Sequence, residues 1–257
     1  MAKPYNQVIL FGDSLLQQSS GVQDGFSFQG ALQDHCIRRL DVVNRGFSGY
    51  STKNALQILP EIFPPRCESG PRIEYLVVLL GANDAALPIP TNTQGIPIEQ
   101  YKENLTKIIT HERIKAHNPK ILLVTPPPLD EIRLTKLDLE YGHKQVTRHA
   151  AVSAAYSQAA RDVAGKVPGV VLVDLQKGIM DKAISMTPDF DASGPPLGYR
   201  EGGKRGALET LLPDGLHFNG DAYRVFFELV KPHIGPFPDS SEGWVFPEWR
   251  AVNPGSL

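Results

Sequence analysis

The sequence predicts an α/β fold in which one parallel sheet lies between two layers of helices. Short apolar runs alternate along the chain with longer stretches of helical periodicity, which is typical of strands joined by helical crossovers. The apolar runs are nearly continuous, as expected for strands that are covered on both faces. No repeat, linker or low-complexity segment divides the 257 residues, so we expect a single domain over residues 1–257.

Five strands are expected. The first covers residues 7–11 and is closed by Gly12, and the clearest covers 73–80, where the apolar run is longest. The others are expected at 41–44, 120–125 and 170–174. Because crossovers between parallel strands are nearly always right-handed, these strands predict a flavodoxin-like order of 2-1-3-4-5 in a three-layer α/β/α sandwich.

Helical patterns fill the intervals between the strands. They cover residues 28–40, 52–62, 98–117, 145–165 and 221–231. Residues 187–213 are rich in Gly and Pro and are expected to form a long loop. Residues 234–257 are expected to form a C-terminal tail that packs on the domain, although its aromatic part, Trp244 to Trp249, could instead form a homo-oligomer contact.

Composition excludes several functional classes. The formal net charge is −2, and the sequence has no cluster of basic residues of the kind that binds nucleic acid or an acidic membrane surface. No apolar run reaches the roughly 18 residues of a membrane span. Cys36 and Cys67 fit neither a disulfide framework nor a zinc pattern and are expected to be free thiols, and the histidines show no ligand-like clustering. We expect a cytoplasmic protein without metal or cofactor.

Candidate functional residues follow the first three strands, where parallel sheets bind ligands at the switch point. Ser14 follows the first strand, and Asn83 follows the third. The loop after the second strand holds two glycines, Gly46 and Gly49, whose backbone N–H groups could approach a ligand. Taken singly, each residue has an ordinary structural use: Ser14 could cap a helix, and the others could serve in turns.

Asp214 and His217 are the remaining candidates. They are three residues apart, so one turn brings their side chains together. The carboxylate could then accept a hydrogen bond from imidazole Nδ1 and leave Nε2 as a base. An isolated Asp-x-x-His is weak evidence, but its occurrence together with Ser14, Gly49 and Asn83, each where an α/β sheet places a functional loop, is far less likely to arise by chance.

These residues resemble the four sequence blocks of the GDSL, or SGNH, hydrolase superfamily. The blocks are Phe11-Gly12-Asp13-Ser14-Leu15, the glycine of Ser48-Gly49-Tyr50, Gly81-Ala82-Asn83-Asp84 and Asp214-Gly215-Leu216-His217. Their order and spacing also match, over residues 7 to about 233. Within the superfamily, residues 211–219 and the tail residues 244–250 resemble the group of isoamyl acetate-hydrolysing esterases.

The resemblance implies a role for each block. Ser14 would be the nucleophile, His217 the base and Asp214 its orienting carboxylate. The oxyanion hole would consist of the Ser14 N–H, the Gly49 N–H and the Asn83 amide, with Gly46 as the alternative to Gly49. The implied fold is the sandwich predicted above, and no cofactor is required.

The expected function is hydrolysis of carboxylic esters, namely short-chain esters such as acetates of small alcohols. The alternatives are a carbohydrate O-deacetylase, a lipase-like hydrolase, or a non-catalytic binding protein on the same fold. An ordinary α/β-hydrolase is rejected because residues 46–50 lack the last glycine of Gly-x-Ser-x-Gly. A phosphate-binding loop at 198–204 is rejected because Arg205 replaces the required Ser or Thr. Loops after residues 84, 126 and 187 are expected to line the substrate pocket.

Overall fold

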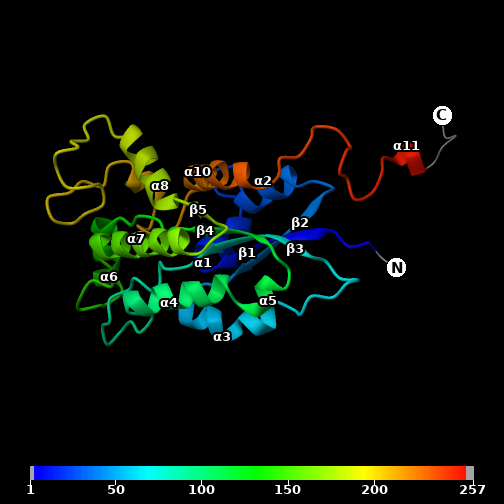
Figure 1. Cartoon of the computed structure of the whole chain (residues 1–257). Helices are drawn as coiled ribbons and strands as arrows, with labels where there is room; N and C mark the ends of the chain where they lie inside the picture. The colour runs from blue at the N-terminus through cyan, green and yellow to red at the C-terminus, as the bar shows by residue number, and fades with distance from the viewer. Residues whose placement is uncertain (1–2, 253–257) are drawn as a thin grey trace.

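The computed structural model describes residues 3–252. Residues 1–2 and the last five residues of the predicted tail, 253–257, lie outside the described residues. A five-stranded parallel sheet forms the centre of the molecule in the order β2-β1-β3-β4-β5, which confirms the predicted order (Figure 1). The strands are β1 (Asn6–Gly12), β2 (Leu40–Gly46), β3 (Ile73–Leu79), β4 (Lys120–Val124) and β5 (Val170–Val173).

Helices cover both faces of this sheet, as predicted (Figure 1). On one face, α2 (Phe28–His35) and α8 (Leu175–Ser185) both pack against α10 (Gly220–Val230). On the other face, α3 (Thr52–Ile62) and α7 (Ala150–Lys166) both pack against α4 (Ile98–Ile109). The remaining helices are α1 (Ser14–Gln17), η1 (Gln18–Ser20), α5 (Glu112–Lys115), α6 (Glu131–Glu140), α9 (Leu208–Leu211), η2 (Lys231–His233) and α11 (Trp249–Val252).

The strands supply two cores, one on each side of the sheet. In β1, Val8 and Leu10 join the core under α2, α8 and α10, whereas Ile9 and Phe11 join the core under α3, α4 and α7. Successive side chains of a strand point to opposite faces, so a strand between two helical layers must be apolar on both. This is why the central strands appear in the sequence as unbroken apolar runs.

Several predicted helix boundaries differ from the structure. The helix predicted at 98–117 is two helices, because His111 accepts the N–H of Arg113 and caps a new helix, α5. The helix predicted from 145 begins at Ala150, because the N–H of Thr147 is held by Asp138 and the chain before it stays non-helical. The helix predicted at 28–40 ends at His35, and β2 already begins at Leu40. Helices α6 and α8 were not predicted.

The tail crosses the end of the molecule where the strands begin, close to the N-terminus (Figure 1). Arg38 donates to the carbonyls of Phe246 and Pro247, and its guanidinium lies 3.8 Å from the centre of the Trp244 ring. The neighbouring Arg39 donates to three further tail carbonyls. The candidate functional residues lie at the opposite end, where the strands finish. Along residues 3–252, no helix combines the length and apolar character needed to cross a bilayer.

Candidate active site

Strand β1 places Ser14 at the carboxyl edge of the sheet. A Cβ on Gly12 would lie 2.2 Å from the carbonyl oxygen of Leu79, so the end of β1 can approach β3 only with glycine at this position. Asp13 then caps helix α1, with its Oδ1 accepting from the N–H of Leu15 at 3.0 Å. The alternative role of Ser14 as the capping residue is therefore wrong, and its hydroxyl is available for another partner.

That partner is His217. The Oγ of Ser14 lies 2.9 Å from the Nε2 of His217, and the Nδ1 of the same ring lies 2.6 Å from the Oδ2 of Asp214. The second oxygen of Asp214 accepts the backbone N–H groups of Leu216, at 2.9 Å, and of His217, at 2.7 Å. The structure thus joins the three residues predicted as a triad in one continuous hydrogen-bonded chain.

The electrostatics of Asp214 define the proton positions in this chain. Partial burial raises the pKa of Asp214, but the hydrogen bonds from the His217 side chain and from the two backbone N–H groups outweigh it and lower the pKa to about 2. At neutral pH, Asp214 is therefore a carboxylate and can only accept. The proton of the neutral ring then belongs on Nδ1, and Nε2 has a lone pair directed at the Ser14 hydroxyl.

A tight turn at Gly215 brings Asp214 and His217 into this position. Gly215 has a φ of +91°, and a Cβ there would lie 2.8 Å from the carbonyl oxygen of Asp130. The carbonyl of Gly215 accepts the N–H of Asp130 at 2.8 Å. The carboxylate of Asp130 is fully buried and accepts from the Nε of Arg205 at 2.6 Å. The predicted loop 187–213 is thereby tied to the turn that holds His217.

Asn83 lies at the end of β3 with its side chain almost fully buried. Its Nδ2 donates to the carbonyl of Tyr50 at 3.0 Å, which links the block after β3 to the loop after β2. An amide nitrogen carries two hydrogens, so one N–H of Asn83 is available beyond this bond.

The loop after β2 contains the two candidate glycines. Gly49 has a φ of +81°, and its carbonyl accepts from the side chain of Gln94 at 2.9 Å. The N–H of Gly46, in contrast, already donates to the side chain of Asn44 at 2.8 Å. This difference favours Gly49 over Gly46 as a donor to a ligand.

A cavity of about 520 Å³ opens beside His217 and Asp214, a volume typical of small-molecule sites. Its wall comes from the segments after residues 84 and 126, both predicted to line the pocket, with α6 included in the second, and from the turn at 214–217. The lining residues are Thr91, Asn92, Thr93, Gln94, Leu134, Leu137, Asp138, Tyr141, His143, Thr147, Arg148, Asp214, Leu216 and His217. Residues 187–207 do not line it, so the prediction that the loop after residue 187 lines the pocket is wrong for this cavity. That loop instead packs behind the turn at Gly215, where Arg205 contacts Asp130.

Two residues at this site were not predicted. Arg148 donates to the Asn83 side chain, and Gln94 donates to the Gly49 carbonyl. Arg148 lies in a polar stretch between α6 and α7, and Gln94 lies in one between β3 and α4. Neither has a motif around it. No sequence signal distinguishes them from surface residues, because their partners are 65 and 45 positions away along the chain.

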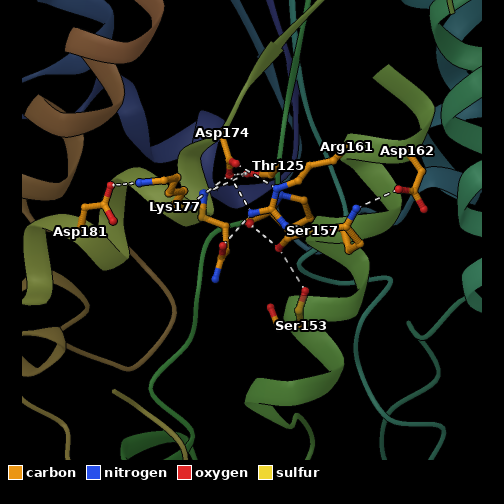
Figure 2. Close-up of polar contacts among 11 residues, drawn as sticks. Thr125, Ser153, Ser157, Arg161, Asp162, Asp174, Lys177 and Asp181 are labelled. Atoms are coloured by element: carbon orange, nitrogen blue, oxygen red, sulfur yellow. Dashed lines mark hydrogen bonds and ion pairs between the residues drawn. The ribbon is translucent and has the colours of Figure 1, made fainter. Parts of the chain in front are cut away.

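A second polar cluster lies at the far edge of the sheet, separated from β1 by β3 and β4. Figure 2 shows Arg161, on α7, reaching across to Asp174 at the start of α8. Both nitrogens of the fork, Nε and Nη2, lie 2.9 Å from carboxylate oxygens, a bidentate pair. Since both partners satisfy each other, we interpret the cluster as structural.

Cys36 is buried and Cys67 is exposed, and both are free thiols. Within residues 3–252, no group of three or more His, Cys, Asp or Glu side chains is arranged to hold a metal ion. The buried His117 instead accepts a structural hydrogen bond from the N–H of Ile73.

A three-layer α/β/α sandwich with serine, histidine and carboxylate hydrogen-bonded at the carboxyl edge of its sheet has the arrangement of a serine hydrolase. The model of the GDSL-like lipase/acylhydrolase family matches residues 10–225. The chain belongs to this family and is a carboxylic ester hydrolase.

Relatives agree with this assignment, and solved structures share the fold. The chain is 36% identical to the isoamyl acetate-hydrolyzing esterase 1 homolog of Bos taurus, over 96% of this chain and 88% of the relative. It is 30% identical to the isoamyl acetate-hydrolyzing esterase of Saccharomyces cerevisiae, over 96% of this chain and 95% of the relative. Among solved structures, a lipase/acylhydrolase from Enterococcus faecalis has the same fold, with a TM-score of 0.57 at 22% identity, over 91% of this chain and 99% of that one.

Proposed function

We propose that this protein hydrolyses short-chain carboxylic esters, such as acetates of small alcohols, with Ser14 as nucleophile, His217 as general base and Asp214 as the carboxylate that orients it. The observation that carries the proposal is the hydrogen-bonded chain from the Ser14 hydroxyl through both ring nitrogens of His217 to Asp214. Its polarity suits proton removal from Ser14, because Asp214 is ionised and Nε2 has the free lone pair.

The reaction would proceed through an acyl-enzyme. The Oγ of Ser14 forms a bond to the ester carbonyl carbon while its proton moves to the Nε2 of His217, and the carbonyl electron pair moves onto oxygen. The backbone N–H groups of Ser14 and Gly49 and the free amide hydrogen of Asn83 would stabilise this oxyanion. His217 then protonates the leaving alcohol, and water releases the acid by the same steps.

Substitution of Ser14 tests this proposal. Ser14→Ala should lower the kcat for p-nitrophenyl acetate by at least about 10³-fold while the melting temperature is retained. A fluorophosphonate probe should label the wild type but not Ser14→Ala. Labelling also separates an esterase from a non-catalytic binding protein on this fold. A Ser14→Ala variant that retains most of the activity would rule out Ser14 as nucleophile.

The cavity supports a substrate with both apolar and polar parts. Its lining includes the apolar residues Leu134, Leu137 and Leu216 and the polar residues Thr91, Thr93 and Gln94. The names of the yeast and mammalian relatives specify one ester, isoamyl acetate. The competing classes are a carbohydrate O-deacetylase and a lipase-like hydrolase. Hydrolysis of a panel of short, medium and long acyl esters, with an acetylated sugar included, would distinguish the three.

Two further expectations remain predictions. The first is self-association through the aromatic tail, in which Phe246 and Trp249 are exposed within the described residues. Light scattering of the wild type and of Trp249→Ser would test it. A cytoplasmic location is the other, and cell fractionation would test it.

A further inference from the structure

Arg148 is in direct contact with the block that follows β3. Its Nη2 donates to the Oδ1 of Asn83 at 3.0 Å, and its Nε donates to the carbonyl of Ala82 at 3.3 Å. It also lines the cavity beside His217 and Asp214. A single guanidinium therefore holds both the side chain of Asn83 and the backbone just before it.

The backbone on both sides of Arg148 is fixed by carboxylates of α6. Asp138 accepts the N–H and the hydroxyl of Thr147, at 2.7 and 3.0 Å. Glu131 accepts from the ring of His149, at 2.8 Å, and from the N–H of Ala150, at 2.9 Å. Because the residues before and after it are fixed, Arg148 meets Asn83 from a defined position rather than as a flexible surface side chain.

The contact with Arg148 fixes which way the Asn83 amide points. The oxygen of that amide accepts from Arg148, and its nitrogen donates to the carbonyl of Tyr50. In the flipped orientation, the NH₂ group would face the guanidinium and the amide oxygen would face a carbonyl, so both contacts would be repulsive. The second amide hydrogen of Asn83 consequently has one defined direction.

The guanidinium of Arg148 forms no ion pair with a carboxylate among the described residues. Across residues 3–252, no carboxylate lies within 4.0 Å of its guanidinium, although Asp138, Asp13 and Asp214 are in its wider surroundings. The two flanking carboxylates of α6 are instead occupied by Thr147, His149 and Ala150. A positive charge thus stands behind the Asn83 amide, which polarises its N–H groups toward a developing anion.

We propose that Arg148 is a positioning residue for ester hydrolysis, which acts through Asn83 by fixing and polarising the amide that stabilises the oxyanion. This inference rests on the proposed function. It predicts that Arg148 contributes to the transition state rather than to ground-state binding, because a full oxyanion forms only during the reaction.

A double-mutant cycle tests the inference. With p-nitrophenyl acetate, we expect Arg148→Gln to lower kcat by about 10- to 100-fold and to change KM by less than about threefold, since loss of a complete oxyanion donor costs about 10²–10³. In an Asn83→Ala background, the same substitution should lower kcat by less than about twofold, because its target is gone. An unchanged kcat, or equal losses in both backgrounds, would overturn the inference.

Two further variants separate positioning from folding. Arg148→Lys keeps the charge but loses the paired hydrogen bonds to Asn83 and Ala82, so it should retain a higher kcat than Arg148→Gln. If Arg148→Gln fails to fold, Arg148→Lys can replace it in the double-mutant cycle with Asn83→Ala. Arg161→Gln is the matched control: it removes a partly buried arginine from the far cluster in Figure 2 and should lower the melting temperature without lowering the kcat of the folded protein.

Failure of the inference about Arg148 can be distinguished from failure of the proposed function. Full activity of Ser14→Ala would overturn the proposed function itself. Full activity of Arg148→Gln in an enzyme that needs Ser14 would overturn only the role of Arg148.

Discussion

Asp214 contacts His217 with both of its carboxylate oxygens, through the ring Nδ1 at 2.6 Å and through the backbone N–H at 2.7 Å. Asp214→Asn should therefore preserve the turn and alter the ring. An amide nitrogen can donate to Nδ1, which favours the tautomer with its proton on Nε2, the wrong one for a base. We expect kcat to fall by about 10³- to 10⁴-fold with little change in melting temperature. Steady-state kinetics check this, and a kcat within tenfold of the wild type would contradict it.

Asp13 is fully buried, and its Oδ2 has no hydrogen-bond partner among the described residues. Burial raises the pKa of Asp13 from its ordinary value of 3.8 to about 7, with Asp84 adding to the rise and with Leu15 N–H, His217 and Arg148 opposing it. Since the pKa is higher in the folded state, the folded protein binds the proton more tightly than the unfolded chain does. The free energy of unfolding should therefore fall as the pH rises from about 4 to about 7.

Asp13→Asn removes this penalty and retains an oxygen that can accept the N–H of Leu15. We expect the melting temperature of the variant to exceed that of the wild type at pH 8, by about 3 °C or more, and the difference to disappear near pH 4. Thermal unfolding across this pH range measures it. Asp34→Asn, at an exposed position on α2, is the control and should give no such pH-dependent difference. A variant less stable than the wild type at pH 8 would refute the assignment.

Arg205 is the ion-pair partner of the buried Asp130. Arg205→Gln leaves this carboxylate buried without its cation, which should lower the free energy of unfolding by about 3 kcal/mol. The adjacent Lys204→Gln is a matched control, because Lys204 and its partner Asp189 are both well exposed and water screens their pair, so this substitution should change the free energy of unfolding much less. Urea unfolding compares the two, and equal losses would show that burial of Asp130 is not the cause.

Gly215→Ala should reduce both stability and activity. The added methyl would meet the carbonyl oxygen of Asp130 at 2.8 Å in a backbone conformation that already disfavours a side chain. The turn would have to shift, and Asp214 and His217 with it, so we expect kcat to fall by at least about tenfold. Gly169→Ala has a similar φ of +79° and open space around the new methyl, so it isolates the effect of backbone strain. Equal kcat values for the two variants would contradict the argument.

The sequence by itself determined the sheet and much of the candidate site. Buried parallel strands must be apolar on both faces, so residues 7–11 and 73–80 are recognisable without coordinates. Ser14, Asn83 and His217 lie in short motifs that occur in the same order as the sequence blocks of the GDSL superfamily, so they could be recognised from the sequence. Helices α6 and α8 were missed, and the break at His111 depends on a single capping contact.

Only the tertiary structure decided which groups meet. The role of loop 187–213 depends on the pairing of Arg205 with Asp130, 75 residues earlier. Arg148 reaches Asn83 across 65 residues. The physical reason is the same in each case: a hydrogen bond is fixed by distance and direction in space, and neither is encoded in the local pattern of the residues that form it.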